Sequence, residues 1–119
     1  MRDHRSLQAW QKANHVVRWV LGMSQQHWRP PVRVPFLHLQ TVTLQVQLHI
    51  ARGNALRSPR HFRRHLVLAY AATIESLELL ALLEATHLVP SGEAADAVRS
   101  LDQVKGELLN MIRQYRHYR

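Results

Sequence analysis

Apolar residues in the first part of the chain recur every three or four positions, the spacing of a helix that buries one stripe. The stripe consists of Leu7, Trp10, Ala13, Val17 and then Val20 or Leu21. We predict a first helix over about residues 6–26. Three prolines within residues 30–35 lack amide donors and disfavour helical backbone before them, so residues 27–35 are predicted to form a stiff connector. Trp28 in this connector fits either a lid on the core or a ring that stacks on a base.

The next apolar segment, residues 37–50, fits two kinds of structure. Its apolar residues from Val42 to Ile50 alternate with polar ones, as in a half-buried strand. No second alternating run occurs, so only self-association would pair such a strand. Wound as a helix, the segment has two apolar stripes on different faces, Leu39-Val42-Val46-Ile50 and Leu37-Leu44-Leu48. We therefore predict a helix over about residues 36–53, with the first stripe in the core and Leu37, Leu44 and Leu48 at a subunit interface.

Capping signals delimit two further helices. Gly53-Asn54 is a plausible stop, and Ser58-Pro59 is a restart with serine as N-cap and proline at the first helical position. The third helix is predicted over residues 59–87. Ser91 can cap a fourth helix over residues 92–116, with acidic residues in its first turn and arginines in its last turns, as the helix dipole prefers.

These elements predict an all-α, antiparallel up-down four-helix bundle that forms a single domain over residues 1–119. No window has the roughly 18 uninterrupted apolar residues of a membrane span, and the first residues lack the apolar core of a signal peptide. We therefore expect no membrane association and a cytoplasmic location. The absence of cysteine excludes disulfides, thiolate zinc sites and a cysteine nucleophile.

The charge of the chain is unevenly distributed. Residues 1–74 contain eleven lysines and arginines against one acid, a net charge of +10, whereas the remaining residues carry a net charge of −2. This asymmetry indicates a polyanionic partner. Fourteen arginines against two lysines are also compatible with a solvated arginine-rich surface that has no partner.

Two basic clusters are candidates for phosphate binding. The first cluster surrounds the start of the third helix and includes Arg52 and Arg63. Its other members, Arg57, Arg60, His61 and Arg64, are predicted to share one helical face, from which they could contact successive phosphates. The second, at the C-terminus, interleaves Arg113 and Arg116 with tyrosines, as sites for single-stranded nucleic acid do. Simple solvation of the first cluster and fraying of the second are the alternatives.

Residue patterns for catalysis are weak. His61 and His65 have the spacing of two ligands on one helix face, but no third ligand is evident nearby. Glu75 and Glu78 lack the Glu-x-x-His motifs of di-iron bundles, so hydrogen bonding in the core or between subunits is the expected role of Glu75. No phosphate-binding loop or nucleophile elbow occurs. We expect a protein that is not an enzyme and that has no metal and no cofactor.

Three short motifs resemble a known family of four-helix bundle proteins. Leu7-Gln8-Ala9-Trp10-Gln11-Lys12-Ala13 resembles its first-helix signature, Ile50-Ala51-Arg52-Gly53 the end of its second helix, and Ser58-Pro59-Arg60-His61-Phe62 the start of its third. The family comprises proteins encoded in intervening sequences of ribosomal RNA genes and accessory proteins of diversity-generating retroelements. Arg52 and His61 stand where the family usually has glutamate, which makes this region more basic.

The resemblance implies a ring-like homopentamer without catalytic residues and, in the retroelement branch, binding to a reverse transcriptase and its RNA. Combined with the charge distribution, the resemblance predicts a basic, homo-oligomeric accessory protein that binds nucleic acid. The expected nucleic acid is RNA, with DNA as the second choice. The alternative is a non-catalytic scaffold that docks an acidic protein. The predicted nucleic-acid-binding residues are Arg52, Arg57, Arg60, His61, Arg63, Arg64, Arg113 and Arg116.

Overall fold

The computed structural model describes residues 3–26, 30–90 and 92–118, and these residues form helices connected by turns, without strands. A short 3₁₀ helix, η1 (His4–Ser6), precedes four α-helices. Their bounds are α1 (Gln8–Gln26), α2 (Pro30–Ala55), α3 (Pro59–Ala85) and α4 (Ala95–Gln114). The prediction of an all-α four-helix bundle is confirmed.

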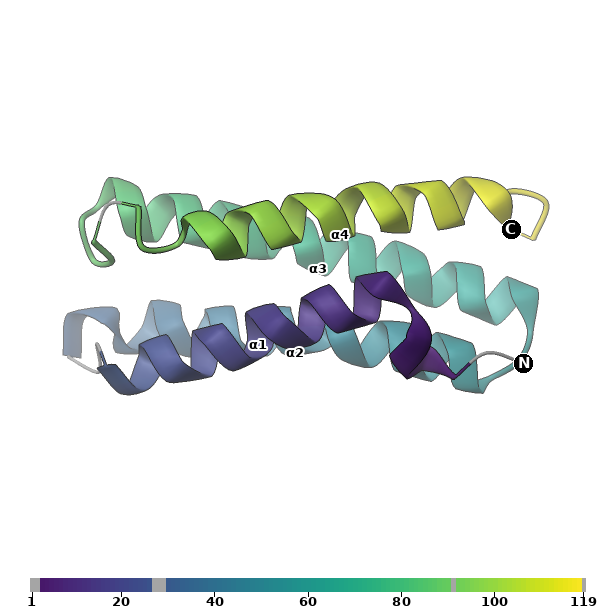
Figure 1. Ribbon diagram of the computed structural model, residues 1–119, viewed down its shortest axis with the longest axis horizontal. Coiled ribbons are helices and arrows are strands. Elements are labelled where there is room, and N and C mark those ends of the chain that lie inside the picture. Colours follow the sequence, from purple (N-terminus) through teal and green to yellow (C-terminus); the bar gives the residue numbers. More distant parts are fainter. Residues whose placement is uncertain (1–2, 27–29, 91, 119) are drawn as a thin grey trace.

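The helices run alternately up and down along a body that measures 44 × 20 × 20 Å (Figure 1). Helices α1 and α3 each pack against both α2 and α4, and the α2–α3 interface is the most extensive. Because the number of helices is even, both termini lie at the end of the bundle that also holds the α2–α3 turn (Figure 1). We call this the turn end.

Helix α2 begins at Pro30, so the prediction of a connector through residue 35 is wrong for residues 30–35. Proline is tolerated in the first turn because the amides there have no intrahelical partner. Pro35 lies deeper, where a proline removes one helical hydrogen bond and its ring crowds the carbonyl four residues earlier, at a total cost of about 3 kcal/mol. Phe36 and Leu39 are fully buried, and their burial contributes roughly 1.5–3 kcal/mol each, which offsets that loss. Trp28 lies outside the described residues.

The core consists of two apolar clusters, one toward each end of the bundle. The cluster at the turn end includes Ala9, Val46, Ile50, Leu66, Val104 and Leu108, and the cluster at the other end includes Val20, Phe36, Leu39, Leu80, Leu83 and Leu101. Four buried hydroxyl residues, Ser24, Thr43, Thr73 and Ser76, each donate a hydrogen bond to the carbonyl four residues earlier in their own helix. Their polar atoms therefore need no partner from another helix.

The helix starts and stops follow the predictions in part. Ser58 is the N-cap of α3, and its hydroxyl accepts a hydrogen bond from the His61 amide, as predicted. Gly53-Asn54 does not stop α2, which continues to Ala55. Ala94 is the residue before α4, so this helix begins three residues later than predicted; the expected cap Ser91 lies outside the described residues.

Candidate nucleic-acid interface

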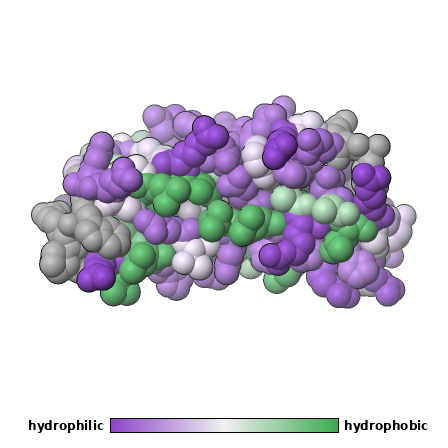
Figure 2. All heavy atoms as spheres, turned by 90° about the horizontal axis from the view of Figure 1, so that it is seen from below, coloured by the Kyte–Doolittle hydropathy of each residue, from purple (hydrophilic) through white to green (hydrophobic). Residues whose placement is uncertain are grey.

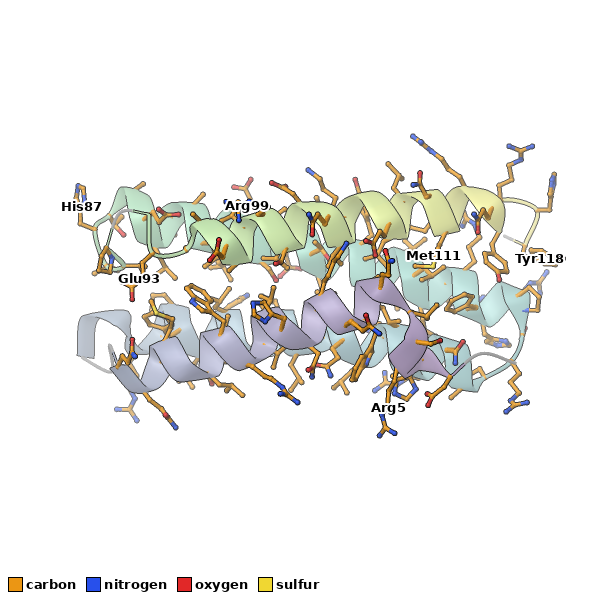
Figure 3. All side chains as sticks on the ribbon, viewed as in Figure 1. Arg5, His87, Glu93, Arg99, Met111 and Tyr118 are labelled. Atoms are coloured by element: carbon orange, nitrogen blue, oxygen red, sulfur yellow. The ribbon has the colours of Figure 1, made fainter. Side chains whose placement is uncertain are left out.

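The fold brings the two predicted basic clusters together at the turn end. Arg52 lies in the last turn of α2, the cluster from Arg60 to Arg64 occupies the first turns of α3, and Arg113 lies in the last turn of α4. Arg116 follows in the C-terminal turn. Arg5 joins them from η1, on the same half of the molecule as Met111 and Tyr118 (Figure 3). Sequence reasoning missed Arg5, because only the up-down topology brings the N-terminus beside residues 52–64.

The arginines of this end are open to solvent and lack acidic partners. Arg52, Arg60, Arg64, Arg113 and Arg116 are exposed, and among the described residues none of them forms an ion pair. We define the basic end as this set together with Arg5, Arg57, His61 and Arg63. Charges that are not neutralised within the protein are available to an external polyanion.

Two predicted members of the basic end differ from expectation. Arg57 does not share a helical face with Arg60, because it precedes α3 in a turn and has a φ of 55°. This left-handed conformation is uncommon for a side chain other than glycine or asparagine. Arg63 is only half-exposed, and its Nε atom is buried without a hydrogen-bond partner among the described residues.

A histidine pair connects α2 and α3 just inside the basic end. The Nδ1 atoms of His49 and His65 lie 3.0 Å apart, so one ring donates and the other accepts. Burial lowers the pKa of both histidines, and the charges of His65 and Arg52 lower that of His49 further. The pKa of His65 is lowered by burial and by the charges of Arg52, His61 and Arg64. The partner of the His65 ring is therefore a histidine of another helix.

Gly53 allows this close contact between the helices. A Cβ atom at Gly53 would lie 2.8 Å from the Cβ of His65 and 3.2 Å from Cδ1 of Phe62. Any larger residue would therefore push the C-terminal end of α2 away from the start of α3. The glycine sets the distance between Arg52 and the arginines of α3.

A cleft of about 510 Å³ opens between the ends of α2, α3 and α4. Its apolar wall is formed by Leu7, Pro59, Phe62, Met111 and Tyr115. Its polar lining side chains are Asn54, Arg57, Ser58 and Gln114, with no acid among the lining residues. The rings of Phe62 and Tyr115 meet edge to face with centroids 5.3 Å apart, which ties the end of α4 to the first turn of α3.

A second, smaller hollow lies beside the first turns of α3. It is lined by Arg60, Arg63, Arg64, Val67, Leu68 and Tyr118. The C-terminal residues reach it through a turn in which the Tyr118 amide donates to the Tyr115 carbonyl over 3.0 Å. The tail is therefore folded against the basic end as far as Tyr118.

The apolar residues left outside the core are concentrated on α2 and α3. Leu37, Leu44 and Leu48, the predicted interface residues, are 44%, 43% and 45% exposed, while the other stripe of α2 is buried. Val67, Leu68 and Leu82 of α3 are also exposed, whereas Leu21 is the only exposed large apolar residue that the described parts of α1 and α4 contribute. Figure 2, which views the side on which α1 and α2 lie, shows apolar atoms in a band along the molecule.

Helix α3 is both long and apolar. Among the described helices, α3 alone has the length and hydropathy of a membrane span, a criterion that the core helix of a soluble bundle also meets.

The middle of α3 carries Glu75, which is exposed. Its carboxylate lies 3.8 Å from Nε2 of His38 on α2. Glu75 therefore does not form hydrogen bonds in the core, and that part of its predicted role is wrong.

The chemistry available at the basic end is cationic and aromatic. The described residues contain no group of three or more histidine, aspartate and glutamate side chains placed to hold a metal ion. Guanidinium groups, two amides and two tyrosine rings can bind phosphates and flat aromatic groups. Comparisons of the chain with protein families, curated proteins and solved structures find no match.

Proposed function

We propose that this protein is a non-catalytic, homo-oligomeric accessory protein that binds RNA through its basic end. The observation that carries the proposal is the gathering of unpaired arginines from four separate segments at one end of the bundle. Such clustering costs repulsion between like charges, which a polyanion relieves. Phosphates would be held mainly by Coulomb attraction and charge-assisted hydrogen bonds, with affinity that depends strongly on salt.

The exposed apolar face of α2 and α3 supports self-association. Its exposed residues include Leu37, Leu44 and Leu48, and burial of these large apolar side chains against another copy would be favourable. Association through the Leu37-Leu44-Leu48 stripe of α2 would place Arg52, one helical turn beyond Leu48, at the edge of the contact, while the basic residues of α3 and α4 lie on other helices. An oligomer would then present several basic ends to one RNA molecule and raise the affinity by avidity.

The family resemblance adds a second partner to this proposal. If the chain acts as the accessory proteins of diversity-generating retroelements do, the assembly is a pentamer and the RNA is bound together with a reverse transcriptase. The departures Arg52 and His61 lie within the basic end and are exposed, so both increase the positive potential in the region that would face the RNA.

The test is a titration of nuclease-treated protein with single-stranded RNA at several salt concentrations. For binding to single strands the logarithm of the affinity falls by about 0.7 per phosphate contact for each tenfold rise in salt. Arg60→Glu with Arg64→Glu should abolish binding at moderate salt, whereas Arg18→Glu with Arg99→Glu, which changes the net charge equally elsewhere, should retain most of it. Circular dichroism should show the same helicity for both variants.

Light scattering during size exclusion tests the oligomer. We expect an oligomer from the unmodified chain, and a monomer of unchanged helicity from a Leu44→Glu, Leu48→Glu variant. RNA binding that ignores salt, or equal affinities of the two arginine variants, would contradict the RNA proposal. Binding of an acidic protein in place of RNA would favour the scaffold alternative.

A further inference from the structure

The cleft at the basic end has the size and lining of a ligand site. Its volume of about 510 Å³ falls in the range of roughly 300–1,000 Å³ found for small-molecule pockets. Apolar side chains form most of its wall, and a few polar groups converge on it, as in such pockets. Three helix ends and the α2–α3 turn contribute to it, so it depends on the fold and not on one flexible loop.

The lining residues select a flat, uncharged or anionic ligand. No acidic side chain lines the cleft, which removes the partner that a cationic ligand would need. Arg57 lines it at one side and supplies a positive charge. The rings of Phe62 and Tyr115 and the side chain of Met111 offer surfaces for stacking, and the amide of the exposed Gln114 carries donors and an acceptor like those that read base edges.

The second hollow repeats part of this arrangement. Each hollow is lined by one tyrosine of the C-terminal segment, Tyr115 in the cleft and Tyr118 in the second hollow. Arg60, Arg63 and Arg64 line the second hollow, and Arg57 lines the cleft. Both lie beside the first turns of α3, and the ring centroids of Tyr115 and Tyr118 are 6.1 Å apart, so the two depressions are neighbours with arginines in the lining of each. Neighbouring nucleotides of a single strand likewise carry bases and phosphates close together.

We propose that the cleft binds an unstacked base of single-stranded RNA, with the neighbouring phosphates held by Arg57 and the arginines at the start of α3. This inference rests on the proposed RNA binding and adds to it a site that recognises a base. A paired base cannot enter the cleft, because its edges and faces are covered in a duplex. The protein should therefore prefer single-stranded to double-stranded RNA.

The left-handed backbone at Arg57 fits this role. A φ of 55° is strained for a residue other than glycine, and such conformations gather at ligand sites. The Arg57 amide donates to the Asn54 carbonyl over 3.4 Å, so the turn keeps these two lining residues adjacent.

The experiment compares two RNAs with the same number of phosphates, one bearing its bases and one abasic. Stacking contributes about 1–3 kcal/mol per base, so the base-bearing RNA should bind about 5- to 150-fold more tightly. Tyr115→Leu should remove most of this advantage. Tyr70→Leu is the matched control, because Tyr70 packs half-buried against the same core cluster but does not line the cleft. Both variants should keep the salt dependence of binding.

A fluorescent adenine analogue within the RNA provides a second readout on the unmodified protein. Its emission should change on binding as its base leaves the stack and enters the cleft. Equal, salt-dependent affinities for the base-bearing and abasic RNAs would overturn the base site while leaving the proposed function intact. If neither RNA binds, the proposed function fails and this inference fails with it.

Discussion

Gly53 provides a sharp test of how closely α2 and α3 approach. Replacing a glycine inside a helix by alanine usually stabilises a protein by about 1 kcal/mol, because alanine has the higher helix propensity. At Gly53 the new methyl group would lie 2.8 Å from Cβ of His65 and 3.2 Å from a ring carbon of Phe62. Overpacking of this kind costs roughly 1–3 kcal/mol. Gly53→Ala should therefore lower the free energy of unfolding by about 0–2 kcal/mol.

Gly106 in α4 is the matched control, because it is exposed and a Cβ there would meet no atom within 4 Å. Gly106→Ala should raise the free energy of unfolding by about 0.5–1 kcal/mol, so the two variants should differ by about 1–3 kcal/mol. Urea unfolding followed by circular dichroism measures the difference at one protein concentration, which matters if the protein is an oligomer. If Gly53→Ala is as stable as Gly106→Ala, the helices do not approach each other as described.

Three further predictions concern stability. His49 and His65 have pKa values lowered from the ordinary 6.5, so the unfolded chain binds protons more readily and stability should fall as the pH drops below about 6.5 toward the folded pKa values; a His49→Gln, His65→Gln variant should show a flatter profile of Tm against pH. Ser58→Ala should cost about 1 kcal/mol in urea unfolding through loss of the N-cap, whereas Ser58→Asp should restore stability. Lys12→Met should lower the free energy of unfolding by roughly 1–3 kcal/mol, because Lys12 pairs with Glu107, whose other carboxylate oxygen is buried without a partner among the described residues. Adding Glu107→Gln to the Lys12→Met variant should recover part of this free energy. No recovery would show that the Lys12–Glu107 pair does not stabilise this site.

The core could be predicted well from periodicity. The alternating residues of α2 fit a strand locally, yet the predicted helical stripe from Leu39 to Ile50 is buried and Leu44 and Leu48 are exposed. A strand at residues 37–50 is excluded because the rest of the chain offers no second strand to pair with it, and this is visible only in the whole sequence. The start of α3 is also predictable, because Ser58 is a favoured N-cap residue and Pro59 is a favoured first residue of a helix.

The start of α2 and the role of Gly53 could not be predicted from local rules. The prolines before Phe36 indicate a connector, but amides of a first turn need no partner, and burial of Phe36 favours continuation of the helix. Gly53 has the appearance of a helix stop, whereas its contact with His65 comes from another helix. The same limit applies to the cleft, whose lining from Leu7 to Tyr115 spans nearly the whole chain.

The excess of positive charge at the turn end makes the two ends of the bundle electrostatically different. The exposed arginines of the turn end form no ion pair among the described residues, whereas the far end, where Glu93 and His87 lie beyond Arg99 (Figure 3), carries charges of both signs. Over a length of 44 Å, the field of a polyanion would turn such a molecule before any contact forms, so that it arrives with its positive pole first. Encounters would then be oriented from the start, with the far end of the bundle pointing away from the nucleic acid.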